Sequence, residues 1–310
     1  MSTILIDLTA LSDEEQKKTC LPIKLFHHDR KELNQVIIGK TDNILTIKDI
    51  KGISIIECKD ASNTESTLDV ISQALKKNDI DGFVTFRNKT QISRFMEKNF
   101  KRSDSTPFIC TFYPNAYTGK KTLLGDLGYK QNRTEGDYLT ALSEMKEIVR
   151  KLTGNESPTS KLLLPSGLPK SEFALGLIEK LKEDPNYNGE LGSADMLQAK
   201  TDILLGDPIV IQSTISGINQ GVTVYNEYLE KGMNTSFQYK MGGFFIQKLM
   251  DTFNASIDKK ITSGGMLLYG FEKKVVLIGN DTTQNNIRSA LDFAYECITE
   301  LNQEQVQDNR

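Results

Sequence analysis

Short runs of aliphatic residues alternate with longer polar and amphipathic stretches along this chain of 310 residues. Runs of this length are typical of strands that are buried on both faces, as in a parallel sheet covered by helices. We expect such strands at residues 4–6, 36–38, 53–56, 82–85, 108–111, 162–164, 203–205 and 275–278. The alternation of strands and helices predicts an α/β fold with a doubly wound, mostly parallel sheet.

Two of the segments between these runs carry apolar residues at helical spacing. Residues 67–75 and residues 138–152 each place Leu, Ile or Met on one stripe, which predicts amphipathic helices. Thr134 lies three residues before Asp137 and is a candidate cap for the second helix.

A long stretch with helical character and many aromatic residues and glycines occupies residues 219–257, and we interpret it as a helical arm. Within it, residues 237–253 repeat Phe, Met and Leu at spacings of three and four, beside Lys240 and Lys248. Such an apolar face is buried in the core, in a dimer partner or at a membrane surface, and the pattern leaves all three open. We expect a single α/β unit over residues 1–301 and a polar tail at residues 302–310.

The composition narrows the class of protein. Apolar residues make up 38% and charged residues 25%, which is ordinary for a folded soluble protein, and the formal net charge of -3 argues against nucleic acid as a partner. We expect a cytoplasmic protein, because the N-terminus lacks a signal peptide and no apolar stretch is long enough to span a bilayer. The four cysteines are far apart, which predicts reduced and mostly buried thiols.

Familiar catalytic motifs are not found. The two histidines, His27 and His28, are adjacent in what we interpret as a polar surface loop, so a histidine-dependent triad is not predicted. The phosphate-binding loop, the dinucleotide-binding glycine motif and the nucleophile elbow are all missing from the sequence. We therefore predict neither a cofactor nor a metal site.

Nine segments of the chain are informative when taken together, at residues 5–7, 36–39, 81–85, 123–128, 163–170, 188–197, 200–207, 263–270 and 275–280. In this order they resemble the PlsX family of phosphate acyltransferases, which convert acyl carrier protein thioesters and inorganic phosphate into acyl phosphates. The resemblance spans nearly the whole chain and rests on segment order, hydrophobic pattern and short ungapped matches. It implies a three-layer sandwich similar to that of isocitrate and isopropylmalate dehydrogenases.

The resemblance also implies a set of site residues at the ends of strands and in turns. Those with implied catalytic roles are Lys170, Asn88 and Asp207. Those implied to bind the substrate or phosphate, either in matched turns or beside them, are Asp7, Arg87, Lys89, Asp126, Gly128, Gly167, Gly189 and Asp195. The alternative for the aspartates is strand-end capping or turn formation, and for the cationic residues a solvated surface position.

Several glycine turns of the family are replaced in this chain. Ala10 and Leu11 stand where paired glycines follow the first strand, the turn around Asn88 lacks its flanking glycines, and Pro208 begins the segment after Asp207. Backbone N–H groups at glycine turns hold anions because no side chain blocks their approach. Phosphate binding then depends on cationic side chains such as Arg87, Lys89 and Lys170, which can supply charge-assisted hydrogen bonds.

The expected function is therefore acyl transfer from acyl carrier protein to inorganic phosphate, in phospholipid synthesis. Phosphate is the nucleophile, Lys170 supplies electrostatic stabilisation, Asn88 supplies a hydrogen bond, and no covalent enzyme intermediate is required. Two alternatives are a catalytically silent paralogue that acts as a binding or scaffold protein and a phosphotransacylase that uses acyl-CoA. A homodimer is the expected assembly, and peripheral membrane contact is a further expectation.

Overall fold

The aliphatic runs form strands of one continuous sheet in the computed structural model, which describes residues 2–58, 63–77, 79–103, 106–114, 120–129, 133–233, 265–279 and 283–301. Its eleven described strands lie in the order β3-β2-β1-β4-β11-β10-β5-β6-β9-β7-β8. Their bounds are β1 (Thr3–Asp7), β2 (Asn34–Gly39), β3 (Ile53–Glu57), β4 (Gly82–Thr85), β5 (Phe108–Pro114), β6 (Lys121–Gly125), β7 (Ser160–Leu164), β8 (Tyr187–Gly192), β9 (Ile203–Gly206), β10 (Met266–Tyr269) and β11 (Lys274–Leu277).

Most neighbouring strands are parallel, but the direction reverses in the middle of the sheet. The strands β3, β2, β1, β4 and β11 are parallel to one another, and so are β6, β9, β7 and β8. Between these two groups, β10 is antiparallel to β11 and β5, and β5 is antiparallel to β6. The strands of the two parallel groups therefore run in opposite directions, and their carboxyl ends lie at opposite ends of the strands of the sheet.

Helices cover both faces of the sheet, as the three-layer expectation requires. One buried cluster joins the inner sides of α1 (Asp13–Asp29), α4 (Glu135–Thr153), α5 (Glu172–Leu181) and α8 (Gln284–Leu301) to one face. A second cluster joins α2 (Thr64–Lys77), α3 (Lys89–Asn99), the 3₁₀ helix η3 (Ser193–Gln198) and the start of α6 (Pro208–Met233) to the other. The predicted α/β class and the mostly parallel sheet are confirmed.

Local capping signals in the sequence form as predicted. The Thr134 side chain accepts a hydrogen bond from the backbone N–H of Asp137, whose carboxylate accepts one from the backbone N–H of Thr134. This reciprocal capping box begins α4, and Gly154 ends it in a left-handed conformation with φ of 70°. The first turn of α4 is thus fixed, and with it the position of the residue that precedes the cap.

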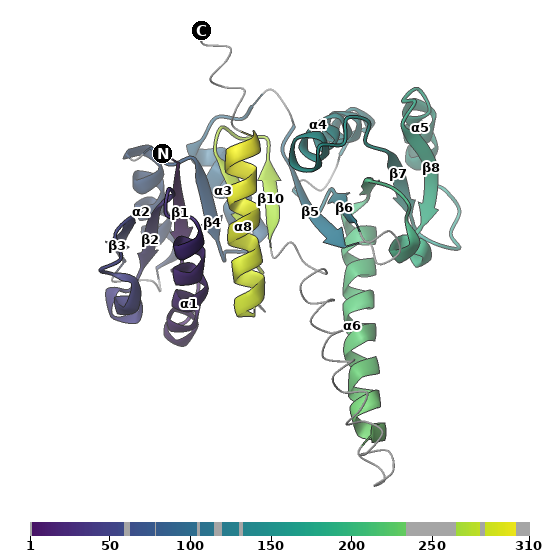
Figure 1. The fold of residues 1–310 in the computed structure, drawn as a ribbon. Coiled ribbons are helices and arrows are strands. Elements are labelled where there is room, and N and C mark those ends of the chain that lie inside the picture. The colour runs from purple at the N-terminus through teal and green to yellow at the C-terminus, as the bar shows by residue number, and fades with distance from the viewer. Residues whose placement is uncertain are drawn as a thin grey trace.

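Helix α6 begins at Pro208 and extends well beyond the strands of the sheet (Figure 1). Its residues 219–233 coincide with the beginning of the segment 219–257, whose assignment as an arm stays a prediction. Residues 237–253 lie outside the described residues, so the three alternatives for their apolar face remain predictions. No helix among the described residues is both long and apolar enough to cross a membrane.

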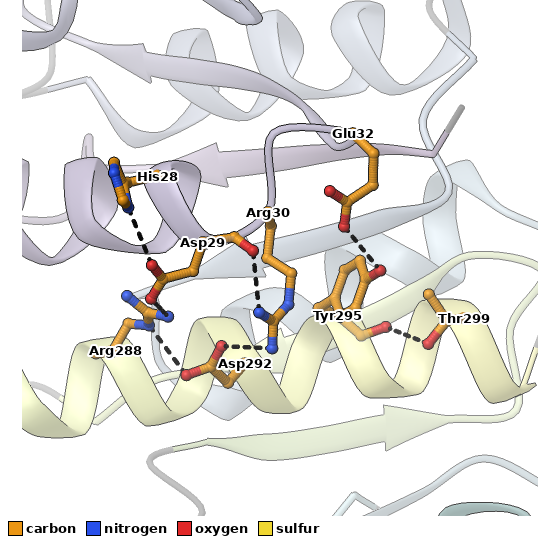
Figure 2. Close-up of polar contacts among 8 residues, drawn as sticks. All are labelled: His28, Asp29, Arg30, Glu32, Arg288, Asp292, Tyr295 and Thr299. Carbon is orange, nitrogen blue, oxygen red and sulfur yellow. Dashed lines mark hydrogen bonds and ion pairs between the residues drawn. The ribbon is translucent and has the colours of Figure 1, made fainter.

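The end of α1 is joined to α8 by a network of charged side chains (Figure 2). Arg288 of α8 bridges Asp29 and Asp292 through distances of 2.7 and 3.0 Å, and the Tyr295 hydroxyl donates to the Glu32 carboxylate at 3.2 Å. The Arg30 guanidinium lies 5.1 Å from the centre of the Tyr295 ring. These contacts link α8 to the end of α1, and none of their residues lines the cavities described below.

The expectation that His27 and His28 lie in a surface loop is wrong. Both belong to α1, and the His27 side chain is buried, where its Nε2 donates to the Lys51 carbonyl oxygen at 2.9 Å and its Nδ1 accepts from Gln35. His28 alone is exposed, beside Asp29. The four cysteines are buried and form no disulfide, as predicted.

Candidate functional site

Asp7 and Arg87 form a buried ion pair at the carboxyl ends of the parallel strands β1 and β4. The Arg87 Nε lies 3.0 Å from the Asp7 carboxylate, and the two side chains are 4% and 0% exposed. The Arg87 Nη2 also donates to the hydroxyls of Thr9 and Thr67 at 2.6 and 2.8 Å. The Asp7 carboxylate accepts further hydrogen bonds from Thr9 and from Thr85. This network points inward and lines none of the cavities described below.

A second buried ion pair follows the carboxyl end of β6, which points in the opposite direction from the carboxyl ends of β1 and β4. The Nε atom of Arg133 is 2.6 Å from the Asp126 carboxylate, and the two side chains are 2% and 0% exposed. Burial raises the pKa of the Asp126 carboxyl, while Arg133 and the backbone N–H groups of Ile109 and Gly128 act against this rise. Arg133 directs Nη2 to the Pro107 carbonyl oxygen, but its buried Nη1 has no hydrogen-bond partner within the described part of the chain.

The turn that follows Asp126 is held by two long side chains. Lys89 of α3 and Gln212 of α6 both donate to the Leu127 carbonyl oxygen, at 2.8 and 2.7 Å. Gly128 has a φ of 93°, a conformation that favours glycine, and a side chain there would lie 3.2 Å from the Gln212 amide. Burial lowers the pKa of Lys89, and the nearby Asp126 carboxylate opposes that change.

Asp207 lies between the carboxyl end of β9 and the first residue of α6. Its Oδ1 accepts hydrogen bonds from the backbone N–H groups of Ile209 and Val210, at 2.8 and 3.4 Å. This arrangement satisfies N–H groups that have no partner within the helix. The side chain is nevertheless exposed and lines both of the next two cavities.

A largely apolar cavity of about 640 Å³ lies between the end of β7, the start of α6 and α5. We call it the α5 cavity. Gly167, Lys170 and Asp195 lie on its wall together with Asp207. Lys170 is half exposed and its Nζ lies 3.1 Å from the Glu190 carboxylate. The apolar wall includes Leu162, Leu164, Leu168, Phe173, Ala174 and Leu177.

A cavity of about 840 Å³ adjoins the α5 cavity, and we call it the Arg133 cavity. Its wall carries Arg133 and Gly128 from the segment after β6 and Arg94 and Glu97 from α3. The two cavities share three lining residues, Tyr138, Phe173 and Asp207. An apolar space thus lies next to a space that contains a buried guanidinium.

A groove along α2 and α3 continues from the Arg133 cavity, with which it shares Thr90 and Arg94. Asn88 and Lys89 line this groove. The Asn88 side chain caps α3 by accepting a hydrogen bond from the backbone N–H of Gln91 at 2.9 Å. Its oxygen therefore has a structural partner.

The predicted site residues fall into separate groups. Gly167, Lys170, Asp195 and Asp207 lie together on the α5 cavity, Gly128 lines the Arg133 cavity beside the buried Asp126, and Asn88 and Lys89 line the groove. Asp7 and Arg87 lie in their own internal network, and Gly189 is a residue of β8 that lines none of these spaces.

Two residues of the site are missing from the sequence-based prediction. Arg133 and Tyr138 flank the capping box of α4, which the sequence does reveal. Because a helix that follows a matched aspartate and glycine turn presents its N-terminus at the same edge, the residues beside its cap were the available signal.

Comparison with known proteins supports the resemblance. No protein-family model matches the chain. Two curated proteins named phosphate acyltransferase, from Staphylococcus epidermidis strains RP62A and ATCC 12228, are 21% and 20% identical to it over 236 residues, which is 73% of this chain and 71% of each relative. The predicted similarity to this family is confirmed at that level, and it supports an enzyme of the phosphate acyltransferase and phosphotransacylase type.

Solved structures with the same fold include enzymes of related name. A branched-chain phosphotransacylase from Enterococcus faecalis V583 superposes with a TM-score of 0.60 at 14% identity, covering 97% of this chain and all of that one. A phosphotransacetylase from Streptococcus pyogenes gives a TM-score of 0.54 at 11% identity, covering 96% of this chain and 94% of that one. At these identities the likeness establishes the fold.

Proposed function

We propose that this protein transfers an acyl group from a thioester carrier to inorganic phosphate and so forms an acyl phosphate. The observation that carries the proposal is that the apolar α5 cavity adjoins a second cavity whose wall includes the buried Arg133. An acyl thioester and phosphate need two such environments side by side, because one reactant is apolar and the other is an anion. The similarity to proteins named phosphate acyltransferase supports the same reaction.

Phosphate is assigned to the Arg133 cavity. Arg133 has a buried Nη1 without a partner among the described residues, and it directly precedes the N-terminus of α4, where backbone N–H groups favour an anion. A hydrogenphosphate ion also carries one hydroxyl, for which the Asp207 carboxylate on the same wall is an acceptor. A positive and an acceptor group on one wall orient the ion as well as bind it.

The acyl chain is assigned to the α5 cavity. Its wall of Leu, Phe, Pro and Ala side chains suits a hydrocarbon chain, and its volume of about 640 Å³ lies in the range of small-molecule sites. Among the described residues that line this cavity, Lys170 is the one with a cationic side chain, and it would offset negative charge that develops at the reacting carbonyl. Phosphate attacks directly, so no covalent enzyme intermediate is needed.

The finer assignment is that acyl carrier protein delivers the acyl group, in phospholipid synthesis, with acyl-CoA as the alternative carrier. The test is phosphate-dependent loss of thioester from acyl carrier protein and from acyl-CoA, measured in parallel with the purified chain. Acyl phosphate is trapped with hydroxylamine to identify the product. Turnover with acyl carrier protein supports the full proposal, turnover with CoA alone transfers it to the other carrier, and no turnover with either favours a binding or scaffold role.

The depth of the α5 cavity is expected to set the acyl chain preference. Ala174 lines this cavity from α5 and is 8% exposed, so Ala174→Leu adds bulk to the apolar wall. We expect kcat/KM for a palmitoyl thioester to fall by about tenfold or more relative to kcat/KM for a butanoyl thioester. The reason is that a change of even one methylene in an apolar pocket alters transition-state binding by ~1–3 kcal/mol. Leu175→Phe, on the exposed side of the same helix, is the control, and equal chain preference in both variants would contradict the assignment.

The ion pair between Lys170 and Glu190 offers two changes of opposite sign. Lys170→Ala is expected to lower kcat/KM by roughly threefold to tenfold, since a half-exposed ammonium is partly screened by solvent. Glu190→Gln removes the carboxylate 3.1 Å from Lys170 and is expected to raise kcat/KM, because the ammonium is then less neutralised. Initial rates at varied ionic strength measure both, and changes of the same sign would show that Lys170 does not act electrostatically.

A further inference from the structure

Tyr138 occupies the boundary between the two cavities. It belongs to the first turns of α4, it lines both the α5 cavity and the Arg133 cavity, and its residue is only 5% exposed. Its ring packs against that of Phe173, with centroids 5.7 Å apart and an angle of 59° between the planes. The ring is therefore fixed by packing at the place where the two reactants would meet.

The Tyr138 hydroxyl is available as a hydrogen-bond donor. No side-chain hydrogen bond of this residue is present within the described ranges, and its hydroxyl is not among their buried unpartnered atoms, so it reaches open space. Burial raises the pKa of Tyr138 to about 12, with the Asp207 and Asp126 carboxylates adding to the rise and Arg133 opposing it. The phenol thus keeps its proton at neutral pH.

The other two residues that both cavities share cannot fill this role. Phe173 has no polar side-chain atom, and the Asp207 carboxylate is an acceptor only. Asn88 lies on the α3 groove, where its oxygen caps the helix, and Lys170 is paired with Glu190. Among the described residues shared by the two cavities, Tyr138 is the one that carries a hydrogen-bond donor on its side chain.

We propose that Tyr138 is a catalytic residue that donates a hydrogen bond to the carbonyl oxygen of the acyl thioester. This role rests on the proposed function. A donor at that oxygen stabilises the negative charge that develops there in the transition state, and it does so without transferring its own proton. The position of Tyr138 between an apolar wall and the guanidinium of Arg133 places the carbonyl within reach of phosphate.

The step is balanced without any further reactant. An oxygen of hydrogenphosphate forms a bond to the carbonyl carbon, and the carbonyl electron pair moves onto oxygen, where the Tyr138 hydroxyl donates to it. The pair then returns, the carbon–sulfur bond breaks, and the sulfur leaves with the electrons of that bond. The proton of hydrogenphosphate passes to the sulfur, so the products are an acyl phosphate dianion and a free thiol.

The test compares Tyr138→Phe with the parent chain and with Tyr187→Phe. Tyr138→Phe retains the ring against Phe173 and removes the hydroxyl alone. Tyr187 lies at the start of β8 and lines neither cavity, and its hydroxyl makes no hydrogen bond within the described residues, so Tyr187→Phe removes a hydroxyl that is remote from the proposed site. Steady-state kinetics with an acyl thioester and phosphate give kcat and both KM values, and thermal unfolding reports stability.

We expect Tyr138→Phe to lower kcat by about a hundredfold, as for loss of one oxyanion donor, with both KM values within about twofold and unfolding temperature unchanged. Tyr187→Phe is expected to retain the parent kcat. A kcat within about threefold of the parent, or a change confined to KM, overturns the role of Tyr138 while leaving the proposed function intact. A parent chain without phosphate-dependent turnover overturns both.

A second variant covers failure of Tyr138→Phe to fold. The change Tyr138→difluorotyrosine retains the hydroxyl and nearly the same size, but the fluorinated phenol ionises at lower pH. Since the role requires a protonated phenol, the rate should then fall as pH rises through the lowered pKa, while the parent keeps its rate over the same range. An unchanged pH profile in the difluorotyrosine protein overturns the proposal.

Discussion

Removing either member of the buried Asp7 and Arg87 pair is expected to lower the free energy of unfolding by about 3–5 kcal/mol, because the remaining charge stays buried without its partner. Asp7→Ala leaves the guanidinium facing Thr9 and Thr67, and Arg87→Met leaves a carboxylate that is 0% exposed. Urea unfolding followed by circular dichroism measures both effects. The exposed pair of Glu14 and Lys18 is the control, and Lys18→Met should leave the unfolding midpoint unchanged.

The double variant Asp7→Leu with Arg87→Met decides between an internal and a phosphate-binding role for Arg87. It replaces two buried charges by apolar groups, so it should be more stable than the sum of the single changes predicts. If Arg87 is a structural residue, the folded double variant retains the parent KM for phosphate. A large rise in that KM, with the fold intact, would instead support the phosphate contact implied by the family resemblance.

Much of the architecture follows from local signals in the sequence. Each predicted aliphatic run coincides with a strand, apart from Ile278, which follows the end of β11. A strand covered on both faces needs apolar residues without interruption. The capping box at Thr134 fixes the start of α4 for an equally local reason. The strand β8 (Tyr187–Gly192) lacks an aliphatic run, since it lies at the edge of the sheet and its residues are exposed or half-buried, and no prediction from hydrophobic runs includes it.

The prediction fails where tertiary contacts decide. His27 is polar, yet it is buried in α1 because the Lys51 carbonyl and the Gln35 amide form hydrogen bonds with its two ring nitrogens. Neither partner can be predicted from the residues that flank His27 in the sequence. The direction of the sheet is also hidden, since the antiparallel pairing of β5 with β6 depends on which strands meet. That reversal separates Asp7 from Asp126 and Asp207, which the sequence presents as equivalent aspartates at strand ends.

The site itself could be predicted only in part. Gly167, Lys170, Asp195 and Asp207 do share one cavity, because they follow or precede neighbouring strands β7, β8 and β9. The family resemblance carries no information on Arg133, which stands outside the matched segments. Its importance depends on burial beside Asp126 and on a free Nη1 among the described residues, and both are properties of the folded chain.

Arg133→Gln is expected to raise the KM for phosphate by roughly tenfold to a hundredfold, in line with loss of a charge-assisted hydrogen bond of ~1.5–3 kcal/mol. The glutamine amide is polar but carries no charge for the anion, and its side chain is shorter than that of arginine. The change also leaves the buried Asp126 carboxylate unpaired, which lowers stability. Asp126→Asn with Arg133→Gln removes both charges, so it separates the two effects.

The rise in KM should persist in this double variant if it comes from the guanidinium itself, whereas stability should partly recover. Phosphate should also raise the unfolding temperature of the parent, because a ligand that binds only the folded state stabilises it, and it should do so much less in either variant. Arg288→Gln is the matched control, since Arg288 is an ion-paired arginine between Asp29 and Asp292 that lines neither cavity. Its phosphate KM should equal that of the parent. A phosphate KM within about twofold of the parent in both Arg133 variants would place the anion elsewhere, because a lost charged contact cannot leave affinity unchanged.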